Sequence, residues 1–199
     1  MLSLCRKHQV LVIADEIHAD WVYGSMTAAS ALDPGVITIL SPSKTFNLQG
    51  MQCSFLFIPD PAQAQAVKQE CDALAYMNNQ TFSHAAALAA YSEEGAVWLA
   101  EAKAYVQENA RVFSRLLSAS AVPLMPMRLE STFLLWVDCC GCCKNDADVV
   151  DLFENRCHLY GSTGSHYQTD LPFIRLNIAV PRSVIEEAAE RLIRALTVR

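Results

Sequence analysis

A lysine stands among serines just after a short apolar run, in residues 39–50, which read ILSPSKTFNLQG. A partly desolvated lysine loses basicity and becomes a nucleophile that can form a Schiff base with a carbonyl group. Lys44 is such a candidate, and the hydroxyls of Ser41 and Ser43 suit a phosphate group. For a lysine taken alone, a solvated loop position is the simpler interpretation.

A carboxylate follows an earlier apolar run, VLVIA at residues 10–14. In open α/β sheets, ligands bind outside the carboxyl ends of the strands, so Asp15 could pair with a cationic ring nitrogen in a dry site. The alternative is that Asp15 and Glu16 simply begin a polar loop.

An arginine interrupts a third apolar segment, FIRLNIAV at residues 173–180. Burying a guanidinium is costly unless it meets a carboxylate, ideally through a bidentate pair. Arg175 therefore predicts either a structural salt bridge or a site for a carboxylate ligand.

Three short apolar runs predict the elements that position Asp15 and Lys44. Residues 10–14, 36–40 and 54–58 are typical of parallel strands buried on both faces. Asp60, followed by Pro61, predicts the start of a helix. We expect a further helix that begins at Ser83 and ends at Gly95.

The second half of the chain has a different pattern. It predicts a long amphipathic helix, a strand, a shorter helix, a strand that contains the arginine, and a final helix with a capping box formed by Ser183 and Glu186. These elements span residues 96–118, 130–138, 146–157, 173–180 and 183 onward. The expected fold class is α/β, with the C-terminal part of a doubly wound, mostly parallel sheet domain at residues 1–85. A small α+β domain would follow at residues 86–199.

Composition excludes several classes of protein. The 199 residues are 52% hydrophobic and 18% charged, and the net charge is −6. The absence of a basic stripe argues against binding to nucleic acids or to anionic membranes. No apolar run is long enough for a transmembrane helix or a signal-peptide core, so we expect a cytoplasmic protein whose eight cysteines are thiols.

Three motifs, taken together, carry a resemblance to a known family. DEIHAD (15–20), SPSKTFN (41–47) and FIRLNIAVPR (173–182) occur in this order. They resemble the pyridoxal-phosphate (PLP) enzymes of the aspartate-aminotransferase fold, known as fold type I, and most closely the MalY/PatB-type C–S β-lyases. The resemblance covers essentially the whole chain.

The resemblance implies a set of cofactor-binding residues. Lys44 would form the Schiff base with PLP, and Asp15 would pair with the pyridine nitrogen and keep it protonated. His18 would face the phenolic oxygen of the cofactor. Ser41 and Ser43 would help to hold the phosphate.

The resemblance also implies a substrate and a reaction. Arg175 would bind the α-carboxylate of a small amino-acid substrate, cystathionine or a cysteine S-conjugate, which is cleaved to a thiol, pyruvate and ammonia. Many enzymes of the wider fold place an arginine eight residues after the lysine, where this chain has Gln52, and this difference favours the lyase branch. The alternatives are a class I/II aminotransferase and, in another class, a non-catalytic remnant or half of a split protein.

Members of the family carry a long segment before DEIHAD, with a glycine-rich phosphate loop and a ring that stacks on the cofactor. We therefore expect this chain to be a C-terminal fragment, and the full-length form to be a homodimer.

Cysteines crowd residues 139–143, which read CCGCC. The segment contains two overlapping CxxC pairs, whereas a zinc site usually needs two separated pairs. We interpret it as a cysteine-rich turn after a strand and predict no metal site.

Overall fold

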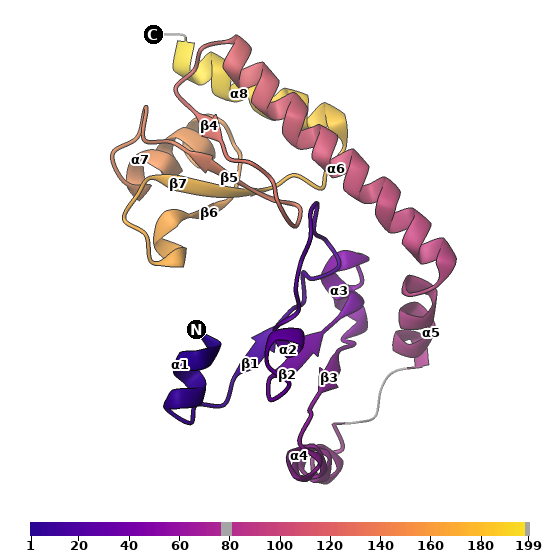
Figure 1. Ribbon diagram of the computed structural model, residues 1–199. Coiled ribbons are helices and arrows are strands. Elements are labelled where there is room, and N and C mark those ends of the chain that lie inside the picture. Colours follow the sequence, from indigo (N-terminus) through magenta and orange to yellow (C-terminus); the bar gives the residue numbers. More distant parts are fainter. Residues whose placement is uncertain (77–80, 198–199) are drawn as a thin grey trace. The chain divides into compact units, whose positions relative to one another are not determined.

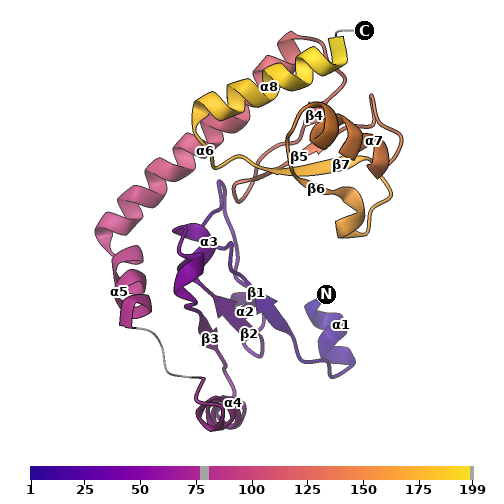
Figure 2. The ribbon, with the colours of Figure 1, turned by 180° about the vertical axis from the view of Figure 1, so that it is seen from behind.

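The computed structural model describes residues 1–76 and 81–197 (Figures 1 and 2). The chain divides into two compact units, Met1–Ala100 and Glu101–Arg199. The division falls inside the long helix α6 (Glu93–Ala119). The sequence-based boundary near residue 85, and the assignment of a cofactor domain and a small domain, remain predictions.

Unit 1 contains a three-stranded sheet in the order β1 (Ile13–Asp15), β2 (Ile37–Leu40) and β3 (Phe55–Phe57). Strands β1 and β2 are parallel, as predicted, but β3 is antiparallel to β2. The prediction of a third parallel strand was wrong because the connection at residues 41–54 contains no crossover helix of the usual length, so the chain turns back directly.

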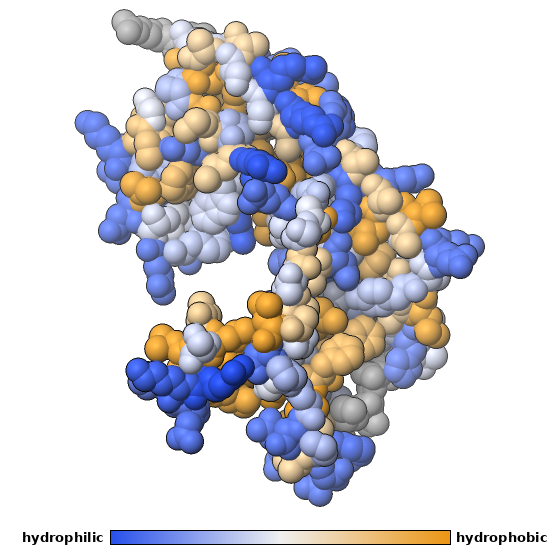
Figure 3. Space-filling model, viewed as in Figure 1, coloured by the Kyte–Doolittle hydropathy of each residue, from blue (hydrophilic) through white to orange (hydrophobic). Residues whose placement is uncertain are grey.

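The prediction that these strands are buried on both faces was also wrong. Only the central strand has buried residues, Ile37 and Thr38. Ile13 on β1 is 58% exposed and Phe57 on β3 is 57% exposed. Hydrophobic side chains accordingly reach the surface of this unit (Figure 3). Within the described residues, β1 is an edge strand with open backbone groups.

Unit 1 also contains several helices, which come before, between and after these strands along the chain. They are α1 (Leu2–Lys7), α2 (Ala29–Leu32), α3 (Pro42–Thr45), the 3₁₀ turn η1 (Gln49–Met51), α4 (Pro61–Ala73) and α5 (Thr81–Ala90).

Two helix boundaries predicted in unit 1 had different outcomes. Asp60 caps α4 as predicted, because its side chain accepts hydrogen bonds from the backbone N–H groups of Ala62 (2.7 Å) and Gln63 (3.0 Å). The helix expected from Ser83 to Gly95 was wrong, because α5 already includes Thr81 and ends at Ala90. Gly95 instead lies in the first turn of α6, where the Ala90 carbonyl leaves no room for a Cβ atom.

Unit 2 is built on an antiparallel sheet in the order β4-β5-β7-β6. These strands are β4 (Met125–Pro126), β5 (Leu134–Asp138), β6 (Ser162–Thr163) and β7 (Phe173–Asn177). Burial alternates along β5 and β7, so Leu135, Val137, Ile174 and Leu176 face the core while Trp136 and Arg175 lie on the opposite face.

The helices of unit 2 follow the predicted order. Besides α6, they are α7 (Asp146–Val150), the π-helix η2 (Asp151–Arg156), the 3₁₀ helix η3 (Gly164–Tyr167) and α8 (Arg182–Thr197). Helices α6 and α8 lie side by side in both views (Figures 1 and 2). The predicted capping box was wrong because α8 begins at Arg182, which places Ser183 inside its first turn.

A buried asparagine joins α6 to the segment after β7. The Asn109 side chain is fully buried and donates to the carbonyls of Ile178 and Val180, both at 2.9 Å. Its amide oxygen accepts a hydrogen bond from the Arg182 guanidinium. This one side chain therefore satisfies two backbone carbonyls in the segment that connects β7 to α8.

Asn109→Ala should destabilise unit 2 by about 2–4 kcal/mol, because it leaves two carbonyls without their donor. Chemical denaturation followed by circular dichroism measures this change. Glu101→Ala, at an exposed position of the same helix, is the matched control. Equal unfolding midpoints for both variants would contradict the role given to Asn109.

Candidate functional site

The parallel pairing of β1 and β2 brings two predicted site segments to the same edge of the sheet. Asp15 is the last residue of β1 and pairs in register with Ile39, near the end of β2. The N–H of Glu16 continues this ladder by donating to the Ile39 carbonyl at 2.9 Å. The loop that carries Lys44 begins directly after β2, so it starts at the same carboxyl edge as Asp15.

The Asp15 carboxylate stands at the start of a turn. Its Oδ1 accepts a hydrogen bond from the Ile17 N–H at 3.1 Å. His18 follows in this turn and is half-buried. Asp15 itself is exposed, so the dry environment expected for it is not provided by the residues that the structure describes.

Ser41 organises the loop that holds Lys44. Ser41 is the N-cap of α3, and its hydroxyl oxygen accepts from the Ser43 N–H at 3.1 Å while Pro42 occupies the first helical position. The same hydroxyl donates to the Cys53 carbonyl at 2.6 Å. Lys44 lies in the last turn of α3 and is half-buried.

The two serines therefore differ in what they can offer to a ligand. Ser41 is buried and its hydroxyl serves the cap and the bond to Cys53. The Ser43 hydroxyl, 2.8 Å from that of Ser41, is half-buried and more available. The sequence reasoning missed the capping role, although a serine followed by proline is a known helix-start signal.

Aromatic residues anchor the end of the same loop. The Phe46 ring packs edge-on against Tyr91 (5.5 Å between centroids) and lies 5.9 Å from the Trp98 ring. The Tyr91 hydroxyl donates to Asp20 at 3.2 Å, which connects the turn after α5 to the segment after β1. Sequence reasoning missed Tyr91, because no local pattern reveals a contact across 71 residues.

Arg175 lies in unit 2, on the face of the sheet opposite the core. Its register partners are Trp136 on β5 and Ser162 on β6. Its guanidinium carbon is 4.6 Å from the centroid of the Tyr167 ring. Arg175 makes no ion pair with any residue that the structure describes, so the structural salt bridge considered as an alternative is not found there. Trp136 is half-buried beside Arg175.

Gln52, at the position where many relatives of the wider fold carry an arginine, ends η1 in the left-handed conformation, with φ of 50°. Its side chain is exposed and uncharged.

The cysteine cluster forms a turn after β5. Cys139 and Cys143 are buried, and the Cys142 and Cys143 sulfurs lie 3.8 Å apart. Burial raises the pKa of Cys143 to about 12, so its thiol stays protonated at neutral pH. Across residues 1–76 and 81–197, no three histidine, cysteine or acidic side chains are arranged to hold a metal ion.

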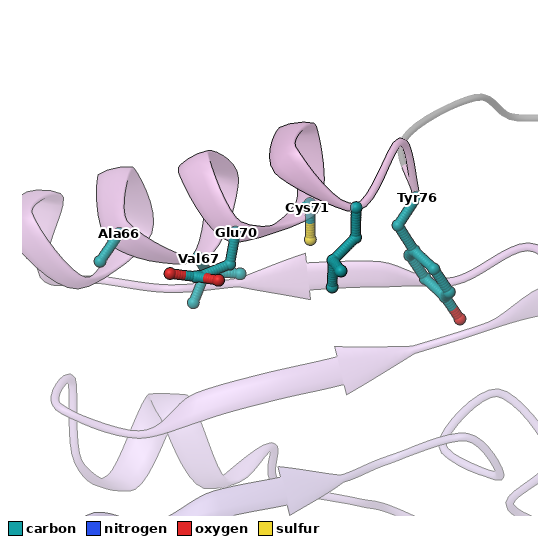
Figure 4. Close-up of a pocket in the computed structure, with 6 residues that line it drawn as sticks. Ala66, Val67, Glu70, Cys71 and Tyr76 are labelled. Atoms are coloured by element: carbon teal, nitrogen blue, oxygen red, sulfur yellow. The ribbon is translucent and has the colours of Figure 1, made fainter.

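An apolar groove of ≈ 430 Å³ lies along α4. Its lining side chains extend from the helix and the following turn toward the neighbouring strand (Figure 4). They are Ala66, Val67, Glu70, Cys71, Leu74 and Tyr76. None of the predicted site residues lines this groove.

Comparison with known proteins agrees with this geometry. Residues 1–192 match the family model "Aminotransferase class I and II". The chain belongs to this family. The family is PLP-dependent, and solved relatives contain bound PLP. No helix in the described part of the chain is both long and apolar enough to cross a bilayer.

Two of the curated relatives that match this chain are named cystathionine beta-lyases, and a third is named MalY. The chain is 28% identical to cystathionine beta-lyase PatB of Bacillus subtilis and 26% identical to MalY of Escherichia coli, each over 98% of this chain. It covers 52% and 51% of those proteins, so it spans about half the length of the curated relatives it matches.

A solved structure of a relative has a similar fold. Cystalysin from Treponema denticola, which contains PLP, is 26% identical and superposes with a TM-score of 0.89 over 98% of this chain and 51% of cystalysin.

Tyr91 predicts a pH dependence of stability. Burial, followed by the charge of Asp20, raises the pKa of Tyr91 to about 12 in the folded chain. The unfolded chain loses this proton near pH 10, so the stabilisation is present below about pH 10 and is lost as the pH rises toward 12. Between these values, the wild-type melting temperature should fall more steeply with pH than that of Tyr91→Phe.

Tyr160→Phe, at a position that is 75% exposed, is the control and should follow the wild-type slope. Parallel slopes for wild type and Tyr91→Phe would refute the burial effect.

Proposed function

We propose that this chain provides the cofactor-attachment and carboxylate-binding residues of a PLP-dependent C–S β-lyase. The observation that carries the proposal is the placement of Asp15 and the Lys44 loop at one carboxyl edge of a parallel strand pair. This is the edge where open α/β sheets bind their ligands. The names of PatB and other curated relatives support the reaction class.

The residues at this edge fit the chemistry of PLP. A half-buried primary amine, a carboxylate, an imidazole and a hydroxyl come from Lys44, Asp15, His18 and Ser43. These groups match an aldehyde, a protonated ring nitrogen, a phenolic oxygen and a phosphate, respectively. Ser41 would act mainly by holding the position of Ser43 and Lys44.

Each residue would have a distinct task. Bound PLP supplies an electron sink for the charge that develops at the substrate α-carbon. Asp15 would keep the ring nitrogen protonated by pairing with it. The Lys44 amine would hold the cofactor between turnovers and, once released, would take the α-proton. Arg175 would bind the substrate α-carboxylate through its N–H donors.

The proposed net reaction is a hydrolytic β-elimination. The bond between the β-carbon and sulfur breaks, the sulfur leaves with its electron pair as a thiol, and water completes the release of pyruvate and ammonia. Cystathionine would give homocysteine, pyruvate and ammonia. The uncharged Gln52 supports this branch over ordinary aminotransferases.

An aminotransferase is the second candidate. A PLP-bound putative aminotransferase from Clostridium difficile is 27% identical and has a TM-score of 0.90, over 98% of this chain and 52% of that protein. A transaminase would use Lys44, Asp15 and Arg175 in the same way but would need a keto acid as acceptor.

We also propose that the full-length form is a homodimer and that unit 1 belongs to the cofactor domain.

The product assay separates these two functions. The full-length form that contains this chain, supplied with PLP and cystathionine, should release pyruvate without any added keto acid, and Lys44→Ala should abolish this release. Lactate dehydrogenase coupling measures the pyruvate. Turnover only in the presence of a keto acid would assign the protein as an aminotransferase instead, and no turnover under either condition would support a non-catalytic remnant.

Cofactor attachment can be tested apart from turnover. Borohydride treatment after incubation with PLP should fix the cofactor on Lys44, as read by peptide mass spectrometry. The exposed Lys7 serves as the internal control for non-specific labelling. Label on Lys7 or another lysine, with Lys44 unmodified, would refute the assignment.

A further inference from the structure

Two aromatic residues, Trp136 and Tyr167, lie beside Arg175 on the face of the unit 2 sheet opposite the core. Trp136 and Ser162 flank Arg175 as its register partners on the two neighbouring strands. Side chains directly opposite in an antiparallel pair lie on the same face and interact. Tyr167, from η3, covers the guanidinium from above the sheet at 4.6 Å.

The Tyr167 ring is itself held by other rings and by its own helix. It meets Trp136 edge-on, with centroids 4.9 Å apart and an interplanar angle of 75°. The short helix η3 is fixed at its start, where Asp146 of α7 accepts from the Ser165 N–H at 3.2 Å. Gly164 packs so closely against Leu171 that a Cβ atom would not fit. These contacts favour a position of the ring beside Arg175.

The charge of Arg175 is not neutralised by this arrangement. No carboxylate pairs with Arg175 among residues 1–76 and 81–197. A ring face attracts a guanidinium through its quadrupole without consuming the N–H donors at the guanidinium edge. The ring contact thus restricts the guanidinium and leaves its donors for a planar, bidentate acceptor.

We propose that Tyr167, supported by Trp136, is a positioning residue that orients Arg175 for the α-carboxylate of the substrate. This inference rests on the proposed function, which makes Arg175 the carboxylate-binding residue. Fixing the guanidinium before binding lowers the entropic cost of ordering it when the carboxylate arrives. Tyr167 acts only through Arg175, and its aromatic ring, rather than its hydroxyl group, orients the guanidinium.

Nuclear magnetic resonance of the arginine Nε–Hε groups tests this inference in the full chain. Arg175→Lys identifies the Arg175 signal by its loss. The ring current of Tyr167 should shift this signal in wild type and in Tyr167→Phe, and the shift should disappear in Tyr167→Leu. Titration with acetate, against chloride at equal ionic strength, should then move the Arg175 signal. The acetate affinity of Tyr167→Leu should be about two- to fivefold weaker, while Tyr167→Phe should match wild type.

Tyr160→Leu, which replaces an exposed tyrosine in the same unit, is the matched control. It should leave the chemical shift of Arg175 and its acetate affinity unchanged. An unaltered Arg175 signal in Tyr167→Leu would overturn the positioning role while leaving the proposed function intact. Equal acetate affinities in Tyr167→Leu and wild type would also overturn it. Failure of acetate to move Arg175 in wild type would instead refute Arg175 as the carboxylate site, and with it both the assignment and this inference. Melting temperatures confirm that each variant is folded.

Discussion

The parallel pairing of β1 with β2 is the constraint on which the candidate site depends. Because parallel strands end at the same edge, the carboxylate after one and the lysine loop after the other must lie near each other, although 28 intervening residues separate Asp15 from Lys44. Ser41 then caps the N-terminus of α3 directly after β2. Its hydrogen bond to the Cys53 carbonyl fixes where this helix begins. The position of Lys44 follows from these two features together.

In unit 2, aromatic rings hold the charged Arg175 side chain, and no carboxylate of the described residues neutralises it. The alternation of β7 places Arg175 opposite the core, and ring contacts take the place of an ion pair. Asn109 performs the complementary task on the buried side, where it satisfies the carbonyls at the end of the same strand segment. Asn109 thus satisfies carbonyls of the chain itself, whereas Arg175 keeps its N–H donors for the substrate carboxylate that we propose.

Local patterns in the sequence predicted what local physics determines. The strands near residues 37–40 and 173–177, the cap at Asp60 and the long helix α6 each follow from hydrophobic periodicity or a capping side chain. The direction of β3 and the start of α8 were predicted wrongly, because both depend on how a connection folds back. The stacking of Tyr167 on Arg175 and the anchoring of Phe46 by Tyr91 join segments that no periodicity relates. The motifs identified the chemistry of the candidate residues, but not the side chains that hold them in place.

The separation of the chain at Ala100 and Glu101 also affects how such a protein can evolve. Lys44 and Asp15 lie in one compact unit and Arg175 lies in the other, so mutations that reshape the surroundings of Arg175 need not disturb the lysine loop. A library of variants restricted to residues 101–199 would vary the proposed carboxylate site while the lysine loop stays constant. If one unit is inherited unchanged while the other varies, proteins that share this fold can acquire different ligand preferences.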